Sequence, residues 1–240
     1  MGELWDYVES GPLPADAIME RDARLLEKLD FTGSPLLHIY EWASPCLTYG
    51  YFTDPHRHLH VDRLNPCGLH MARRPTGGGI IFHGTDFAFS VLLPASHPRF
   101  SLNTLDNYAL INRKVAEAIF PFTASHGLPE LLARDPLRAP SPCLPFCMAK
   151  PTRYDLIING QKVGGAAQRR SKNGLLHQAS LSLLLPAMET LQLVLKEPQP
   201  VLEAMQRFSR GLLPPSTNPQ SLQKVRIEIT RHLQQSLFSI

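Results

Sequence analysis

Two glycine-rich segments, each joined to a strand-like run, constrain the fold of this chain more than any other feature. Gly77–Gly79 lead directly into the apolar run "IIFH", and four small residues, Gly164–Ala167, continue a strand-like segment that begins at Gln161. Small residues are poor strand formers, so their place here indicates that another group approaches the backbone closely. A plain flexible turn is the alternative for Gly77–Gly79, because neither a P-loop nor a dinucleotide-binding pattern is present.

Cations adjoin both glycine-rich segments. Arg73 and Arg74 precede the first, and Lys162 precedes the second. Guanidinium and ammonium groups next to exposed backbone N–H groups favour a carboxylate or a phosphate as ligand. A lysine at a hairpin is more often a solvated surface charge. The repeated combination of small residues and cations nevertheless favours one anion site bounded by both segments.

Hydrophobic periodicity and turn residues predict an α+β fold with mostly antiparallel sheets flanked by helices. Residues 15–29 and 102–120 carry helical apolar stripes, and the tail from Ala187 onward is expected to be helical in two or three pieces. Asn159-Gly160 predicts a tight hairpin turn. Strands are expected at 35–42, 46–52, 69–73, 80–83, 87–94, 154–165 and 174–186, with a hairpin joining 80–83 to 87–94.

Composition sets the class of the protein. The chain has 240 residues and a formal charge of +3, which does not suggest a nucleic acid partner. We expect no membrane span, because no apolar run approaches about 20 residues, and no leader peptide at the N-terminus. The cysteines do not form paired CxxC units, so we expect no metal site and a reducing, cytoplasmic location. These cysteines are Cys46, Cys67, Cys143 and Cys147.

Three blocks resemble the lipoate–protein ligase A family, which includes lipoate ligases and octanoyltransferases and is related in fold to biotin–protein ligases. The blocks are "RRPTGGGIIFH", "YDLIINGQKVGGAAQRR" and "LLHQASLSL", in the family order, and "LHIYEWASPCLTYGYF" looks like the family's opening strand pair. The resemblance covers roughly Leu4 to Leu185. It implies a biotin/lipoate ligase-like catalytic domain, and we expect residues 1–240 to form this single domain without a separate C-terminal accessory domain.

The resemblance also implies a site. The two glycine-rich segments would form the walls of a tunnel for a medium-chain acyl group, and Lys162 would contact the reactive acyl carbonyl or acyl phosphate. The remaining residues expected to bind substrate or adenylate are Arg73, Arg74, Thr76, Gly77, Gly78, Gly79, His83, Asp155, Gly164, Gly165, Ala166 and His177.

Two activities of the family compete for this chain. "TGGGIIFH" and "LLHQASL" look closer to a ligase, which would use ATP and Mg²⁺ to make lipoyl-AMP and pass lipoate to a carrier lysine; this is the expected activity. The alternative is an octanoyltransferase, because "CMAKPTRYDLIINGQK" resembles cysteine-dependent members and makes Cys147 the nucleophile. Cys143, close by, makes that signal less specific. A binding protein without catalysis is the third hypothesis.

The resemblance further implies the partners. Expected acceptors are lipoyl domains of 2-oxoacid dehydrogenase E2 subunits or the glycine cleavage H protein, and acyl carrier protein is a candidate donor of octanoate. One departure from the family appears after His83, where the sequence reads "HGTDFAFS", so the role of Asp86 stays open.

Overall fold

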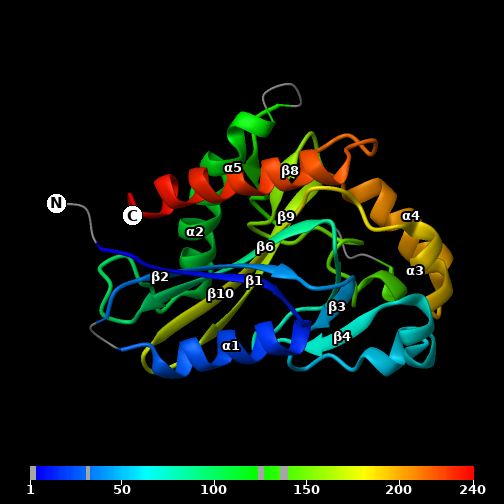
Figure 1. Ribbon diagram of the computed structural model, residues 1–240, viewed down its shortest axis with the longest axis horizontal. Helices are drawn as coiled ribbons and strands as arrows, with labels where there is room; N and C mark the ends of the chain where they lie inside the picture. The colour runs from blue at the N-terminus through cyan, green and yellow to red at the C-terminus, as the bar shows by residue number, and fades with distance from the viewer. Residues whose placement is uncertain (1–3, 31–32, 124–126, 136–139) are drawn as a thin grey trace.

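A seven-stranded sheet and a three-stranded sheet form the centre of the protein (Figure 1). The computed structural model describes residues 4–30, 33–123, 127–135 and 140–240. In spatial order, the large sheet consists of β1 (Asp6–Leu13), β2 (Leu36–Trp42), β6 (Asp86–Pro94), β10 (Gly174–Ser182), β9 (Gln161–Arg170), β8 (Leu156–Ile158) and β7 (Glu130–Leu131). The small sheet consists of β4 (His70–Arg73), β3 (Cys46–Tyr49) and β5 (Ile80–His83). Among the described strands only β1–β2 and β3–β4 pair in parallel, which confirms the predicted α+β fold with mostly antiparallel sheets.

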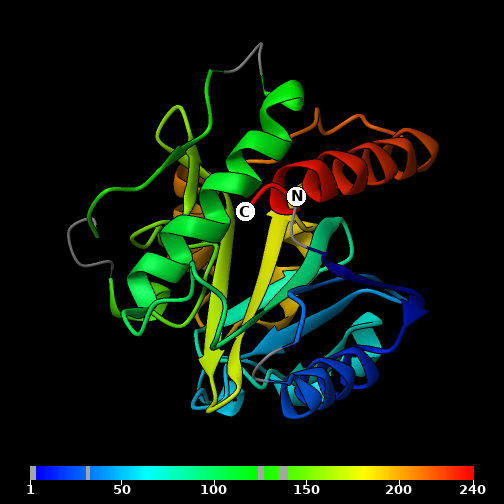
Figure 2. The same cartoon turned by 90° about the vertical axis from the view of Figure 1, so that its left-hand side faces the viewer.

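Helices cover both faces of the large sheet (Figures 1 and 2). Helix α1 (Ala15–Lys28) packs on one face, and α2 (Thr104–Ile119) and α5 (Pro219–Leu237) pack together on the other. The helices α3 (Met188–Val194) and α4 (Pro198–Phe208) join the core that lies beside the small sheet. Short 3₁₀ turns complete the helical elements at Pro55–Arg57, Val61–Arg63, Asn65–Cys67, Phe120–Phe122 and Ser141–Cys143. No helix in the described ranges has the length and apolarity needed to cross a bilayer.

Strand β6 explains why the sheet has helices on both sides. All nine of its residues are buried, because successive side chains point to opposite faces and each face meets a helix. Phe87, Phe89 and Val91 pack into the core shared with α2 and α5, whereas Ala88 and Leu92 pack toward α1. An uninterrupted apolar run therefore marks a central strand here.

The predicted hairpin between 80–83 and 87–94 is wrong, although both strands exist. Strand β5 pairs with β3, with His83 opposite Cys46, while β6 pairs with β2 and β10. The connection passes from the small sheet to the large one, and Gly84 takes a φ of +139° at this crossing. Turn residues specify a change of direction but not the strand that will pair, and pairing here is decided by strands distant in sequence. The predicted hairpin at Asn159-Gly160 is confirmed, with φ values of 51° and 78° at the two turn residues.

Candidate active site

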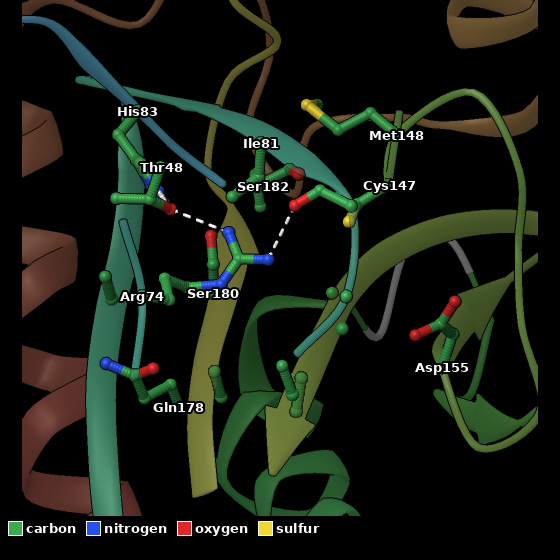
Figure 3. Close-up of a pocket in the computed structure, with 18 of the residues that line it drawn as sticks. Thr48, Arg74, Ile81, His83, Cys147, Met148, Asp155, Gln178, Ser180 and Ser182 are labelled. Carbon is green, nitrogen blue, oxygen red and sulfur yellow. Dashed lines mark hydrogen bonds between the residues drawn. The ribbon is translucent and has the colours of Figure 1, made fainter. Parts of the chain in front are cut away.

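A cavity of about 180 Å³ lies on the α1 face of the large sheet, between β9, β10 and the segment that precedes β5 (Figure 3). Much of its surface comes from residues with little or no side chain. These residues are Gly78, Gly79, Ala88, Gly164, Gly165, Ala166, Ala167 and Ala179. The two glycine-rich segments therefore meet across one space, as the sequence predicts. Because neither wall projects large side chains, an unbranched apolar chain can lie against bare backbone.

Lys162 is a buried member of this site and not a solvated surface charge. It is the second residue of β9, directly after the hairpin turn, and is 8% exposed. Its Nζ atom forms an ion pair with Asp155 Oδ2 at 2.7 Å and donates to the backbone oxygen of Cys147 at 3.1 Å. A Cβ atom on Gly165 would stand 2.6 Å from Asp155 Oδ1 and 2.7 Å from Lys162 Nζ. The glycine thus leaves the room that the ion pair occupies.

Cys147 lies at the same cavity through its side chain. Its amide donates to Ile80 O at 2.9 Å, and Ile80 N donates to Pro145 O at 2.6 Å, so the segment before Lys162 is held against β5. The Cys147 Sγ atom is 3.4 Å from the position of a Cβ on Gly79. Cys143 differs, because it is fully buried in the neighbouring core and its thiol donates to Pro200 O.

Arg74 brings a buried positive charge to the cavity. Its guanidinium donates to Thr48 Oγ1 at 2.8 Å and to the carbonyl oxygens of Gly77 and Gly79 at 3.1 and 2.6 Å. Burial lowers the pKa of Arg74, and the neighbouring Cys147 thiol opposes that effect. No carboxylate among the described residues pairs with it, and its Nε atom has no hydrogen-bond partner. A buried cation without a counter-charge favours an anion or a polarised oxygen nearby.

A series of hydrogen-bonded side chains holds Arg74 in place, and Asp86 is its last member. Thr48 accepts from Arg74, so its hydroxyl proton points to His83 Nε2 at 2.8 Å, and His83 Nδ1 donates to Asp86 Oδ2 at 2.6 Å. Burial alone would raise the pKa of Asp86, but its interaction with His83, together with hydrogen bonds from Ser180 and the Gly84 amide, lowers it to about 2. Asp86 is therefore an ionised anchor for His83.

The cavity brings together most of the residues predicted from the sequence. Those that line it are Arg74, Gly78, Gly79, His83, Cys147, Asp155, Lys162, Gly164, Gly165 and Ala166. Arg73, Thr76, Gly77 and His177 do not line it. Arg73 is exposed and stacks on Tyr51 at 4.7 Å, because β4 alternates and only the next arginine turns inward. Thr76 and Gly77 support the wall indirectly, through bonds to Gln178 and Arg74.

His177 lies on the opposite face of β10, which corrects its assignment to the substrate site. It is fully buried against Tyr108 of α2 and bonds to Gln168, and burial lowers its pKa to about 3. The adjacent Gln178 lines the cavity instead, as do Ser180 and Ser182. The sequence could have indicated this, because successive side chains of a strand point to opposite faces, which places Gln178, Ser180 and Ser182 on the same face.

The site has the parts of an acyl-transfer centre: a thiol, a buried lysine paired with a carboxylate, a second buried cation and an apolar slot with small-residue walls. Within the described ranges, no cluster of three or more histidine, cysteine or acidic side chains is arranged to hold a metal ion.

A family model described as the lipoyl protein ligase A/B catalytic domain matches residues 14–229. The chain belongs to this family. Among curated relatives of the family, octanoyltransferase LipM of Geobacillus kaustophilus is 30% identical over 185 residues, which cover 75% of this chain and 66% of the relative. Octanoyltransferase LipM of Bacillus subtilis is 28% identical over 211 residues, covering 85% of this chain and 74% of that protein. The chain thus spans only part of the length of these relatives.

Solved structures share this fold. A crystal structure of lipoate-protein ligase A bound with ATP superimposes with a TM-score of 0.71 at 18% identity, covering 99% of this chain and 86% of that one. The fold is therefore that of lipoate ligase catalytic domains. Both relatives identified by sequence carry the name octanoyltransferase, whereas the solved structure carries the name lipoate-protein ligase A.

Proposed function

We propose that this protein is a cysteine-dependent octanoyltransferase that moves an octanoyl group from a carrier protein to a lysine of a lipoyl domain. The observation that carries the proposal is that the Cys147 side chain lines the cavity that also holds Lys162, with Lys162 Nζ 3.1 Å from the Cys147 backbone oxygen. The names of the sequence relatives support the same activity. ATP and Mg²⁺, which a ligase would need, have no part in this proposal.

In the first half-reaction, the Cys147 thiolate attacks the carbonyl carbon of the octanoyl thioester on the donor carrier. The bond from the carbonyl carbon to the carrier sulfur breaks, and the departing carrier thiolate takes a proton from the Lys162 ammonium. The product is an octanoyl thioester on Cys147. Lys162 and the unpaired guanidinium of Arg74 both stand at this cavity, where positive charge stabilises a thiolate and the negative charge that develops on the carbonyl oxygen.

In the second half-reaction, the neutral amine of the acceptor lysine attacks the thioester on Cys147. The carbon–sulfur bond breaks, Cys147 leaves as a thiolate, and the proton lost by the acceptor amine passes to neutral Lys162, which restores the starting state. The acceptor would be the lipoyl domain of a 2-oxoacid dehydrogenase E2 subunit or the glycine cleavage H protein, and acyl carrier protein is the proposed donor. Both groups of partners follow from the family and the proposed activity.

The cavity walls supply affinity for the acyl chain. Each buried methylene contributes about 0.8 kcal/mol, so an eight-carbon chain gains binding free energy without polar contacts. The segments Gly78–Gly79 and Gly164–Ala167 line the slot with little or no side chain, so the acyl chain can lie against their backbone. Free lipoate or octanoate would occupy the same slot.

Cys147→Ser tests the proposal directly. Incubation of the wild type with an octanoylated carrier should give a hydroxylamine-sensitive adduct on Cys147, seen by intact-protein mass spectrometry, and octanoylation of a lipoyl domain. Both should vanish in Cys147→Ser, because a serine hydroxyl without a matched base is a far weaker nucleophile. Cys143→Ser is the matched control and should retain both. Lipoylation by Cys147→Ser with free lipoate, ATP and Mg²⁺ would reject the transferase and restore the ligase.

A further inference from the structure

A second buried polar network lies between α1 and the large sheet, next to the cavity. At its centre is Asp22 of α1, which is fully buried. Asp22 Oδ1 accepts from His38 Nδ1 at 2.8 Å, and Oδ2 accepts from Ser90 Oγ at 2.6 Å and from Gln178 Nε2 at 2.7 Å. Neither Asp22 nor His38 lines the cavity, but Gln178 does. The network therefore touches the site through Gln178 and through Tyr40, a cavity residue whose hydroxyl lies 3.4 Å from Ser90 Oγ.

The network repeats the order of side chains that holds Arg74: an arginine donates to a hydroxyl, the hydroxyl to a histidine, and the histidine to an aspartate. Its members are Arg21, Ser10, His38 and Asp22, with Arg21 Nη1 to Ser10 Oγ and Ser10 Oγ to His38 Nε2 both at 2.8 Å. The arrangement makes His38 a donor to Asp22, so the carboxylate receives hydrogen bonds from every neighbour.

This fixed direction extends to the glycine segment. An ionised carboxylate only accepts, so Gln178 must turn its NH₂ group to Asp22 and its carbonyl oxygen the other way. That oxygen, Gln178 Oε1, accepts from Thr76 Oγ1 at 2.7 Å. Thr76 belongs to the segment Arg74–Gly79, which has no strand pairing of its own, and its backbone oxygen accepts from Tyr51 N at 2.9 Å. The position of this wall thus depends on isolated backbone bonds and on the side-chain bonds of Arg74 and Thr76.

We propose that Asp22 is a positioning residue of the acyl cavity, which acts through Gln178 and Thr76 to hold the glycine segment at the spacing that admits an acyl chain. Packing alone does not require a carboxylate there, since α1 presents apolar side chains such as Ile18, Met19 and Leu26 to the same layer. A buried carboxylate is costly unless its hydrogen bonds are all made. Here the donors, His38, Ser90 and Gln178, lie on three strands of the large sheet, and Gln178 also lines the cavity. The claim about acyl binding rests on the proposed function, whereas the claim about the wall does not.

The test is a double-mutant cycle with Asp22→Asn and Thr76→Val. Asn has nearly the shape of Asp but carries an NH₂ donor, so Gln178 can no longer donate to residue 22 and accept from Thr76 as it does in the wild type. Val has a volume similar to that of Thr but lacks the hydroxyl donor at position 76. With an octanoyl thioester as donor, each variant should raise the half-saturating concentration for acylation of Cys147 by about tenfold, the effect of one lost hydrogen bond. The limiting rate should stay within about threefold.

The double variant should be no worse than the larger single variant, because both changes cut the same chain. Thr76→Ser, which keeps the hydroxyl, should remain within about twofold of the wild type. Leu233→Ala, in the core under α5, is the control for general destabilisation and should lower the melting temperature without raising the half-saturating concentration. An unchanged half-saturating concentration in Asp22→Asn, or a multiplicative effect in the double variant, would overturn the proposal.

Hydrogen exchange separates this proposal from the proposed function. Exchange of the Tyr51 amide, which donates to Thr76 O, should accelerate in Asp22→Asn and Thr76→Val but not in Leu233→Ala. If no octanoyl donor acylates wild-type Cys147, the transferase fails while the exchange result still decides whether Asp22 positions the wall. If exchange is unchanged in both variants, the positioning role fails whatever the enzyme does. If Asp22→Asn does not fold, Thr76→Val still tests the series of hydrogen bonds from Asp22 through Gln178 to Thr76.

Discussion

The two walls of the cavity look alike in sequence but are held in different ways. Gly164–Ala167 lie inside β9, paired with β10 along their length, with Gly164 opposite Leu181 and Gly165 opposite Ser180. The segment Arg74–Gly79 lies outside any strand and is held by three isolated backbone bonds to residues 49–51 and by the side chains of Arg74 and Thr76. A continuous backbone ladder holds the first wall, whereas isolated backbone bonds and the side chains of Arg74 and Thr76 hold the second.

This difference predicts where each wall is sensitive. A change of side chain on β9 leaves the ladder intact and acts on whatever the side chain touches, which here includes the reacting groups. On the Arg74–Gly79 segment, the same change acts on the path of the chain itself. Activity and stability should therefore respond separately in the Gly164–Ala167 wall and together on the segment before β5.

Lys162→Ala should have the largest effect. Loss of charge stabilisation and proton transfer should reduce octanoyl transfer by about 10²–10³. Because Lys162 is buried and paired with Asp155, its removal also strands a buried carboxylate and should cost about 3–5 kcal/mol of unfolding free energy. Urea unfolding and single-turnover transfer measure the two effects.

The double variant Lys162→Ala/Asp155→Asn separates these effects. Removal of the stranded charge should return most of the lost stability, while transfer stays low because the ammonium is still absent. Transfer near the wild-type rate in a folded Lys162→Ala protein would show that this side chain has no catalytic role.

Gly79→Ala and Gly165→Ala compare the walls directly. A methyl on Gly79 would stand 2.1 Å from the backbone oxygen of Pro145, so the chain must move, and both the melting temperature and the acylation rate should fall. A methyl on Gly165 would meet the ends of Lys162 and Asp155, which can rotate away, so the acylation rate should fall much more than the melting temperature.

Gly77→Ala is the matched control for these variants, because nothing lies within 4 Å of a Cβ at Gly77 and its φ is not positive. It should change the melting temperature by no more than about 2 °C and leave acylation intact. Equal ratios of stability loss to activity loss in Gly79→Ala and Gly165→Ala would contradict the distinction between the walls.

The sequence blocks predicted the α+β class, the two glycine walls and the convergence of Lys162, Asp155 and Cys147, because motif spacing and local turn chemistry carry that information. What they missed depends on contacts between distant segments. The strands on either side of Gly84 belong to different sheets, and strand β1 pairs at the sheet edge although its sequence, "DYVESGPL", has no clear strand pattern.

The error at His177 has a different cause. "LLHQASL" presents two adjacent polar residues, and the resemblance did not say which of the two faces the cavity. Strand phase decides this, and the phase follows from the pairing of Gln178 with Ala167 and Ser90 across the sheet. The network through Asp22 was not visible in the sequence, because its members come from α1, β1, β2, β6 and β10, which are far apart along the chain.

His177 gives the smallest expected effect, one confined to the helix-facing side of β10. Its folded pKa is about 3, below the ordinary value of 6.5, so the unfolded chain binds more protons below pH 6.5 and stability falls as the pH drops toward 3. One pKa unit corresponds to about 1.36 kcal/mol, so His177 should cost about 2 kcal/mol at pH 5 relative to pH 7.

His177→Gln can keep the bond to Gln168 and cannot titrate. As the pH falls from 7 to 5, the wild type should lose unfolding free energy relative to His177→Gln. Asp86 does not interfere, because its pKa of about 2 places its loss of stability below pH 4. A difference that is independent of pH would contradict the depressed pKa of the buried His177. Acylation of Cys147 by His177→Gln at pH 7.5 should stay within about twofold of the wild type, since Gln178 and not His177 lines the cavity.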